Sequence, residues 1–195
     1  MNPGTSSRRA LVVYASWIFA SFVGAILATV VIVVPTSLPW VNEDRWVGFI
    51  LFPSFALPLG AAQAVVLSRS IPRSGRWILA CLVGWLFPFF VMTLAGPLAS
   101  APLPGSTAAL FLLIGASTGC AQWLLLRGSF PAGGVWIAAT LVGWTALAAL
   151  VGQPFSVHAQ SILLGVVPSL ATGLVLAFWT GLRHAPQPDS EHSAV

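Results

Sequence analysis

The sequence predicts an all-α integral membrane protein whose six transmembrane helices form three repeated helical hairpins. Three observations support this prediction. The 195 residues are 57% hydrophobic and only 6% charged, with a mean hydropathy of +0.93. The few charged residues divide the chain into long apolar segments. One stretch, Gly60–Trp85, returns 59 residues later as Gly119–Trp144 without a gap, and 14 of the 26 aligned positions are identical.

The low charge content excludes an ordinary soluble domain, in which about 25% of residues are charged. All eight basic residues are arginines. They form no stripe interleaved with aromatic residues, so the pI of about 10.6 does not indicate a nucleic-acid surface. The apolar segments exceed the ~18 residues that suggest a membrane span. The predicted partner is therefore the lipid bilayer.

Prolines, glycines and arginines separate the six predicted spans. The approximate ranges of these spans are 10–34, 46–68, 77–96, 106–126, 134–152 and 158–182. The first span is too long for the ~7–15-residue core of a cleaved signal peptide, so we expect it to be retained. The repeats then cover about 10–69, 70–128 and 129–184. A short N-terminal segment, 1–9, precedes them, and a polar tail, 185–195, follows with two prolines that favour disorder.

The placement of the arginines predicts the orientation in the membrane. Seven of them lie on one side of the predicted topology, and only Arg45 lies on the other. This excess places both termini in the cytoplasm of a protein of the cell inner membrane. The seven are Arg8, Arg9, Arg69, Arg73, Arg76, Arg127 and Arg183.

The repeat extends to a third hairpin. The odd spans share a Trp-to-Gly segment at Trp17–Gly24, Trp77–Gly84 and Trp136–Gly143. The even spans share segments that begin at Gln63, at Gln122 and, more loosely, at Phe178, so that a phenylalanine replaces the third glutamine in this alignment. Successive hairpins have parallel topology, which is compatible with a pseudo-threefold arrangement about the membrane normal.

Small residues recur one helical turn apart within these spans, and such pairs let helix backbones approach closely. We expect packing seams at Gly24, Gly60, Gly84, Gly115, Gly119 and Gly143. In the sixth span the pair Ala177/Gly181 is expected to do the same. Indole rings favour the membrane interface, which is where we expect the tryptophans near span ends, namely Trp46, Trp77, Trp123, Trp136 and Trp179.

Gln63 and Gln122 are the most informative polar residues. Each lies five to six positions before an arginine, about 8–9 Å inside the predicted cytoplasmic boundary at the helical rise. An amide at that depth must be hydrogen-bonded. One interpretation is a cross-helix hydrogen bond. The other is a ligand-binding site, to which Trp85 and Trp144 contribute from deeper in the membrane.

Few features of the sequence indicate a transport function. Four prolines interrupt predicted spans, at Pro53, Pro58, Pro88 and Pro168. They indicate static kinks or the discontinuous helices of transporter sites, and we favour kinks. No Asp, Glu, Lys or Arg is predicted inside a span, whereas proton-coupled pumps and ion transporters keep such groups in their pathway.

Fewer features still indicate an enzymatic function. Gly115–Gly119 matches G-x-S-x-G, but it lies in mid-span rather than at a strand-to-helix turn. The chain is similar to rhomboid intramembrane serine proteases in its six spans, with Ser117 on the fourth and His158 on the sixth. It departs from them because Thr118 replaces the family's glycine, the second span lacks the family's histidine and asparagine, and His158 lies near the predicted outer surface.

Cofactor and metal sites are not expected. Cys81 and Cys120 lack the spacing of metal ligands. Neither has a neighbouring basic residue in the sequence that would lower the pKa of its thiol. The loop that carries Arg69, Arg73 and Arg76 indicates topology and, as a second interpretation, binding of anionic lipid. A membrane protein partner or a homo-oligomer is a further candidate partner.

The pairing of the Gly-x-x-Gln-Trp-x-x-Leu-Arg and Trp-x-x-Ala-x-x-x-Gly-Trp motifs resembles uncharacterised bacterial multi-pass membrane proteins built from repeated hairpins, and the resemblance covers most of spans two to five. This resemblance implies no activity. The leading hypothesis is therefore a non-enzymatic membrane protein with no catalytic residues, acting as an accessory subunit or binding an apolar ligand. The alternative is a facilitator of a small neutral or amphipathic solute, and an intramembrane protease ranks third.

Overall fold

The computed structural model describes residues 4–36, 44–69, 71, 74–95, 106–130, 133–151 and 157–183, and within them the secondary structure is entirely helical. The helices are α1 (Gly4–Thr36), α2 (Asp44–Leu67), α3 (Arg76–Ala95), α4 (Ser106–Leu126), α5 (Gly133–Val151) and α6 (Val157–Arg183). The predicted all-α class is confirmed, and each predicted span falls on one helix. The predicted disorder of the tail and the position of Arg73 lie outside the described residues.

Four helices are long and apolar enough to cross a bilayer, through the stretches Ser7–Val31, Ala108–Leu126, Gly133–Leu150 and Ile162–Gly181. The described apolar stretches of α2 and α3 are shorter, Pro53–Leu67 and Arg76–Pro88. The prolines predicted to interrupt spans lie inside helices α2, α3 and α6, and each helix continues through them. Discontinuous helices are therefore not observed at these prolines.

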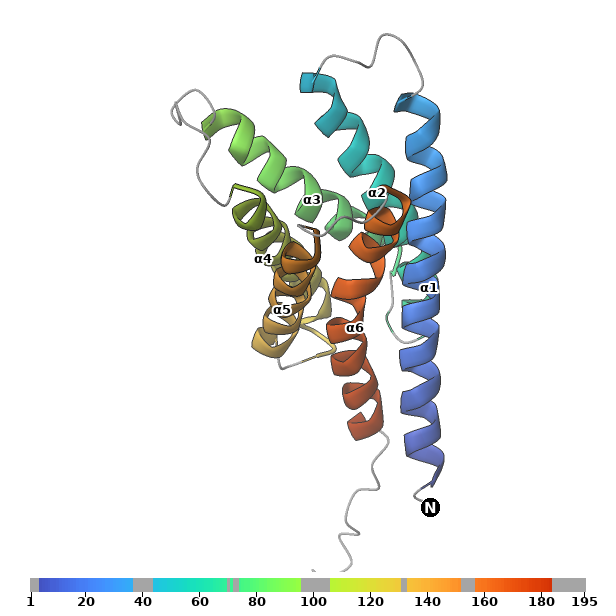
Figure 1. Cartoon of the computed structure of the whole chain (residues 1–195). Helices are drawn as coiled ribbons and strands as arrows, with labels where there is room; N and C mark the ends of the chain where they lie inside the picture. Colours follow the sequence, from blue (N-terminus) through green and yellow to red (C-terminus); the bar gives the residue numbers. More distant parts are fainter. Residues whose placement is uncertain are drawn as a thin grey trace, which may run out of the picture.

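The six helices pack in a closed ring. Each helix contacts its neighbours in chain order, and α6 also contacts α1. Helix α1 begins, and α6 ends, at the same end of the bundle (Figure 1). This end, called the arginine end below, carries the exposed side chains of Arg8, Arg9, Arg69, Arg76 and Arg127.

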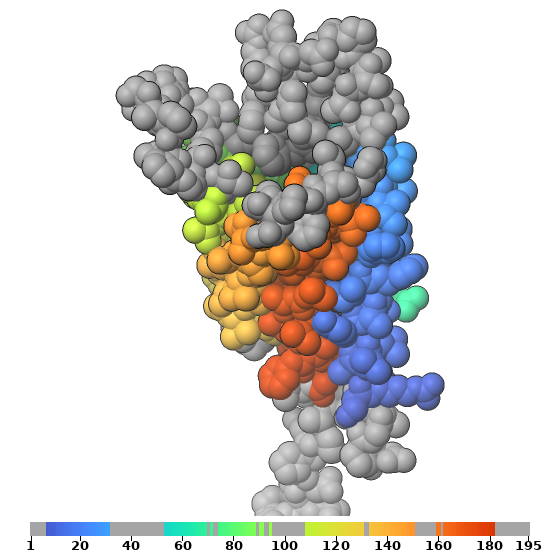
Figure 2. All heavy atoms as spheres, viewed as in Figure 1, coloured from blue at the N-terminus to red at the C-terminus, as the bar shows by residue number. Residues whose placement is uncertain are grey.

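The distribution of polarity is inverted relative to a water-soluble protein. Each helix exposes large apolar side chains on the outside of the ring, for example Phe19, Val65, Leu79, Leu124, Val142 and Phe178. Figure 2 shows the continuous outer face of α5, α6 and α1. Polar residues are buried instead, namely Ser21, Gln63, Thr118, Gln122, Thr140, Ser169 and Thr172. Soluble monomers rarely expose contiguous apolar patches beyond a few hundred Å², so this surface is suited to contact with lipid.

Three glycines bring the odd helices onto the helix that follows each of them. A Cβ on any of these glycines would lie against a backbone Cα atom of the neighbouring helix. The pairs and distances are Gly24–Leu59 2.8 Å, Gly84–Thr118 2.5 Å and Gly143–Pro168 2.6 Å. The other predicted packing glycines, Gly60, Gly115 and Gly119, would meet the nearest side-chain atom at 3.0–3.2 Å.

Two expectations are wrong. A Cβ on Gly181 would meet only Ala10, at 3.9 Å, so the Ala177/Gly181 pair forms no close seam. Trp77, Trp136 and Trp179 lie in the core rather than at a lipid interface, because the inside of the ring supplies ring contacts and, for Trp77 and Trp136, a hydrogen-bond acceptor. Trp123 is half-buried, and the side chain of Trp46 lies outside the described residues.

The glycine contacts predict a large position effect within one helix. Gly143→Ala is expected to destabilise the protein by roughly 1–3 kcal/mol, because the added methyl group overlaps the backbone of α6 at Pro168. Gly134→Ala in the same helix meets no atom within 4 Å and is expected to leave stability unchanged. Unfolding by denaturing detergent, followed by Trp fluorescence, measures both. Equal stability of the two variants would contradict the close contact.

Candidate functional site

The four residues predicted to bind a ligand come together in the interior of the ring. Gln63, Gln122, Trp85 and Trp144 are each no more than 5% exposed. They line a common cavity of about 30 Å³, whose wall takes residues from all six helices. The structure therefore places them at one site, and it shows which neighbours occupy their polar groups.

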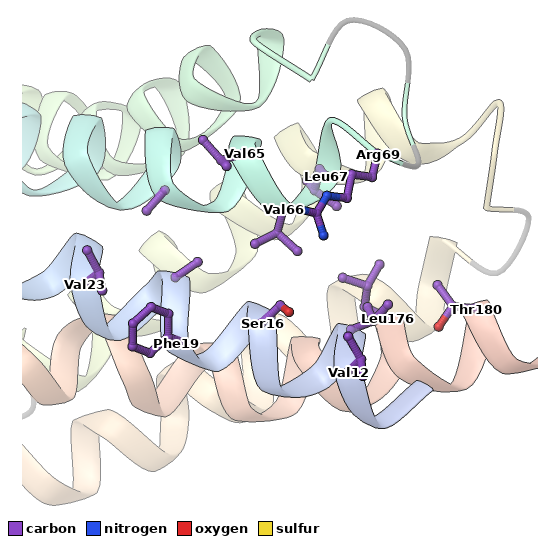
Figure 3. Close-up of a pocket in the computed structure, with 13 residues that line it drawn as sticks. Val12, Ser16, Phe19, Val23, Val65, Val66, Leu67, Arg69, Leu176 and Thr180 are labelled. Carbon is purple, nitrogen blue, oxygen red and sulfur yellow. The ribbon is translucent and has the colours of Figure 1, made fainter. Parts of the chain in front are cut away.

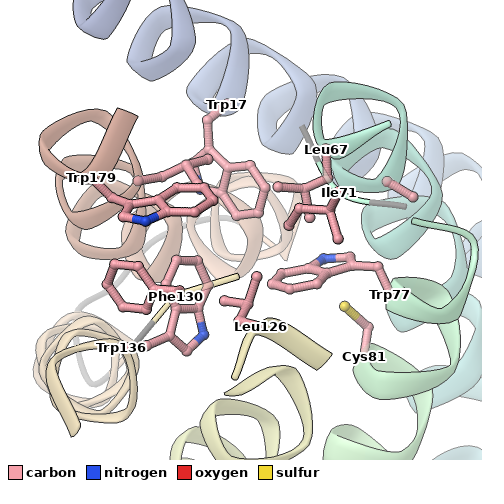
Figure 4. Close-up of a cluster of buried hydrophobic side chains, with 11 residues drawn as sticks. Trp17, Leu67, Ile71, Trp77, Cys81, Leu126, Phe130, Trp136 and Trp179 are labelled. Carbon is pink, nitrogen blue, oxygen red and sulfur yellow. The ribbon is translucent and has the colours of Figure 1, made fainter. Parts of the chain in front are cut away.

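Three tryptophans at corresponding positions of the sequence repeat form one layer across the ring. The indole rings of Trp17, Trp77 and Trp136 contact one another edge to face (Figure 4). Their centroids are separated by 5.7, 5.8 and 6.2 Å, and each pair has an interplanar angle of 78°. Such T-shaped pairs contribute about 0.5–1.5 kcal/mol beyond their buried area. The three odd helices are thus joined at the centre of the bundle.

Each of these indoles donates its N–H to the even helix that precedes it around the ring. Trp77 Nε1 donates to Gln63 Oε1 at 3.0 Å, and Trp136 Nε1 donates to Gln122 Oε1 at 3.1 Å. The third indole, Trp17, donates to the hydroxyl of Thr172 at 3.2 Å. The alignment that put Phe178 at the third glutamine position is wrong, since Phe178 is 70% exposed and Thr172 is the acceptor. That alignment followed the aromatic residues of α6 and missed the small polar residue one to two turns earlier.

The amide nitrogens of the two glutamines have different surroundings. Gln63 Nε2 donates to Ser21 Oγ at 3.0 Å and to Ser169 Oγ at 3.2 Å. Gln122 Nε2 donates to Cys81 Sγ at 3.5 Å, and sulfur is a weaker acceptor. Gln63 is therefore hydrogen-bonded to α1, α3 and α6, whereas the partners of Gln122 in the described part of the chain lie on α3 and α5.

A second aromatic layer lies farther from the arginine end. Trp85 and Trp144 make a T-shaped contact at 5.1 Å. Phe55 stacks on Trp85 at 5.1 Å, and Phe111 stacks on Trp144 at 5.8 Å. At the corresponding position of the first repeat stands Ala25, so this layer contains two indoles where the first layer contains three.

Ser117 is placed as a structural hydroxyl. Its Oγ lies 2.6 Å from the carbonyl oxygen of Gly84 on α3, and 2.7 Å from that of Leu113 in its own helix. These carbonyls are acceptors for the serine proton and cannot remove it. The side chain of His158, the other residue of the protease comparison, lies outside the described residues.

An apolar groove on the outside of the ring was not predicted. It has a volume of about 390 Å³ and lies between α1, α2 and α6. Apolar and small side chains line it, and Arg69 lies at one end (Figure 3). Arg76 lines a separate groove of about 430 Å³ at the arginine end, together with Trp77 and Ser74. Two of the arginines predicted to bind anionic lipid thus lie in different grooves.

Within the described part of the chain, no three His, Cys, Asp or Glu residues gather as metal ligands. Comparison with known proteins adds no assignment: no protein-family model, no curated protein and no solved structure matches this chain. The site must therefore be interpreted from its own geometry.

The unequal contacts of the two glutamines predict unequal effects of the same substitution. Gln63→Leu leaves the Trp77 N–H without its acceptor and frees the hydroxyls of Ser21 and Ser169. Gln122→Leu leaves the Trp136 N–H without its acceptor and ends one weak contact to sulfur. A buried donor without a partner costs about 1–3 kcal/mol. We expect both variants to be destabilised and Gln63→Leu to lose more.

Unfolding in denaturing detergent measures this difference. A double variant, Trp136→Phe with Gln122→Leu, serves as the control, since the second substitution should cost less once the indole N–H is absent. Equal losses in the two single variants would contradict the hydrogen-bond assignment.

Proposed function

We propose that this chain is a six-span, non-enzymatic protein of the cell inner membrane, with both termini in the cytoplasm. We further propose that it binds an anionic, amphipathic lipid in the groove between α1, α2 and α6. The observation that carries this proposal is an apolar groove whose described lining residues include one cationic side chain, Arg69, at its arginine end.

The six-span topology is supported by the outer surface of the two helices with short apolar stretches. Val65 of α2 is 71% exposed and Leu79 of α3 is 60% exposed, which is as high as on the four longer helices. Both helices also complete the ring by contacts on either side. A helix that shares the ring and has an apolar outer face is best stabilised at the same depth in the bilayer.

The groove arises from a change in the separation of α1 and α2. The close contact of Gly24 with Leu59 holds the two helices together. Towards the arginine end the helices separate (Figure 3). Small residues such as Ser16, Ala20 and Ala62 line the space between them. Valine side chains of both helices form its walls. An extended acyl chain matches these dimensions and this polarity.

The charge selects the headgroup. A lipid chain gains little by leaving other lipid chains, since both surroundings are apolar. Discrimination must therefore come from Arg69, which is exposed beside the groove. A basic residue near the membrane surface attracts anionic lipid by about 1 kcal/mol, which corresponds to roughly fivefold enrichment.

A facilitator that uses the axis of the ring is less well supported. The Trp17, Trp77 and Trp136 rings occupy the axis at one level, and Trp85 and Trp144 occupy it at another. The cavity between them measures about 30 Å³. An amphipathic solute would require both layers to open.

The lipid proposal predicts the composition of co-purified lipid. Wild-type protein reconstituted in equal amounts of phosphatidylcholine and phosphatidylglycerol, then re-extracted in mild detergent, is expected to retain roughly fivefold more of the anionic lipid. Arg69→Gln is expected to reduce this ratio to about one, because the headgroup loses its cation. Mass spectrometry of the retained lipid measures the ratio.

Arg127→Gln is the matched control. Arg127 is also exposed at the arginine end, and it does not line the α1/α2/α6 groove. Its removal should leave the enrichment unchanged. An equal loss in both variants would assign the enrichment to general surface charge and overturn the groove as its source.

The topology proposal predicts the accessibility of single cysteines. In a Cys81→Ser/Cys120→Ala background, Gly75→Cys lies between α2 and α3 with no atom near its Cβ. A membrane-impermeant maleimide is expected to label it only after the inner membrane is opened, whereas Ser100→Cys should be labelled in spheroplasts. Labelling of both Gly75→Cys and Ser100→Cys in intact spheroplasts would show that α3 does not cross the membrane.

A further inference from the structure

The small cavity in the interior of the ring contains a buried hydroxyl without a partner. The cavity measures about 30 Å³ and lies between the two tryptophan layers. Thr118 is 4% exposed, and its Oγ1 is the one fully buried side-chain N or O atom in the described residues that has no hydrogen-bond partner. Thr118 lines this cavity.

Other threonines of the bundle do not share this situation. Thr140 donates to the carbonyl of Trp136 and Thr172 to that of Pro168, each one helical turn earlier. The carbonyl one turn before Thr118 belongs to Ile114, and it lies 3.2 Å from the hydroxyl of Ser117. The hydroxyl of Ser117 therefore competes with that of Thr118 for this backbone acceptor.

A second polar group on the cavity wall has unused capacity. A glutamine amide carries two N–H groups. Gln63 directs them to Ser21 and Ser169, but Gln122 has only the contact to Cys81 among the described residues. Gly60 lies three positions before Gln63, as Ser169 lies three positions before Thr172, so a glycine without a hydroxyl is the counterpart of Ser169 in the repeat. One N–H of Gln122 is thus left without an acceptor among the described residues.

A third group is supplied by the proline in α6. Pro168 has no N–H, so the carbonyl of Leu164 loses its usual donor in the helix. Both residues line the same cavity. The cavity wall therefore contains three residues with an unused polar group. These are the hydroxyl of Thr118, one amide N–H of Gln122 and the carbonyl oxygen of Leu164.

We propose that this cavity binds one water molecule. The water accepts a hydrogen bond from Gln122 Nε2, shares one with Thr118 Oγ1 and donates to the carbonyl of Leu164. Buried waters typically make about three such bonds, and a space of at least ~10–15 Å³ is needed to hold one. The volume suits water and is too small for an amphipathic ligand, so the ligand-binding role predicted for Gln63, Gln122, Trp85 and Trp144 is assigned to water at this site.

The test measures contact between water and the glutamine side chains by NMR. Protein labelled with ¹⁵N in glutamine and tryptophan is placed in lipid nanodiscs. The side-chain amide of Gln122 is identified by its contact with the Trp136 N–H, and that of Gln63 by its contact with the Trp77 N–H. Wild-type protein is expected to show a stronger water cross-peak at the Gln122 amide than at the Gln63 amide, whose N–H groups are directed to Ser21 and Ser169. Thr118→Val, which keeps the shape and removes the hydroxyl, should reduce the Gln122 cross-peak severalfold.

Thr145→Val is the matched control, because the Thr145 hydroxyl is exposed on the outside of α5 and bonds to its own helix at Leu141. It should leave the cross-peak unchanged. A wild-type protein without a water cross-peak at Gln122 would overturn the proposal. Cross-peaks of equal strength at Gln63 and Gln122 would also overturn it, since they would show that the water is not bound through Gln122 in particular. Both of these comparisons are made in the wild-type protein and require no variant to fold.

Discussion

The rest of this structure depends on the contact of three indole rings inside the bundle. Between apolar helices in a bilayer the hydrophobic effect is nearly absent, so packing and interhelical hydrogen bonds determine association. Trp17, Trp77 and Trp136 supply both, through edge-to-face contacts with one another and N–H bonds to the even helices. The bond from Trp17 to Thr172 joins residues 155 positions apart and links the first helix to the last. The closed ring follows from it.

The glycines and the tryptophans act together. Gly24, Gly84 and Gly143 each lie two turns after one of the three tryptophans, and each permits close approach to the next helix. That approach brings large rings to the axis without leaving a wide channel. Where the helices separate again, at the arginine end, grooves form on the outside. The buried polar side chains inside the ring and the apolar groove outside it therefore both follow from the angles at which the helices cross.

Departures from the repeat are more informative than the repeat itself. Thr172 replaces a glutamine, Ala25 replaces a tryptophan, and Gly60 stands where Ser169 provides a hydroxyl. Each of these substitutions changes the contacts of one repeat inside an otherwise regular ring. The unpaired hydroxyl of Thr118 and the weak contact of Gln122 with Cys81 lie in the interior of this ring, where both residues line the small cavity.

The sequence by itself determined the helical class and the positions of the six helices, and it singled out Gln63, Gln122, Trp85 and Trp144, which the structure brings to one cavity. These depend on local composition and on repetition, which are visible along the chain. It did not determine that the tryptophans near span ends point inward, that Thr172 rather than Phe178 is the third acceptor, or that Arg69 borders a groove. A periodic apolar helix has no sequence signal that distinguishes its lipid face from its protein face. Only the neighbouring helices decide which side is buried, because in a membrane both faces are apolar.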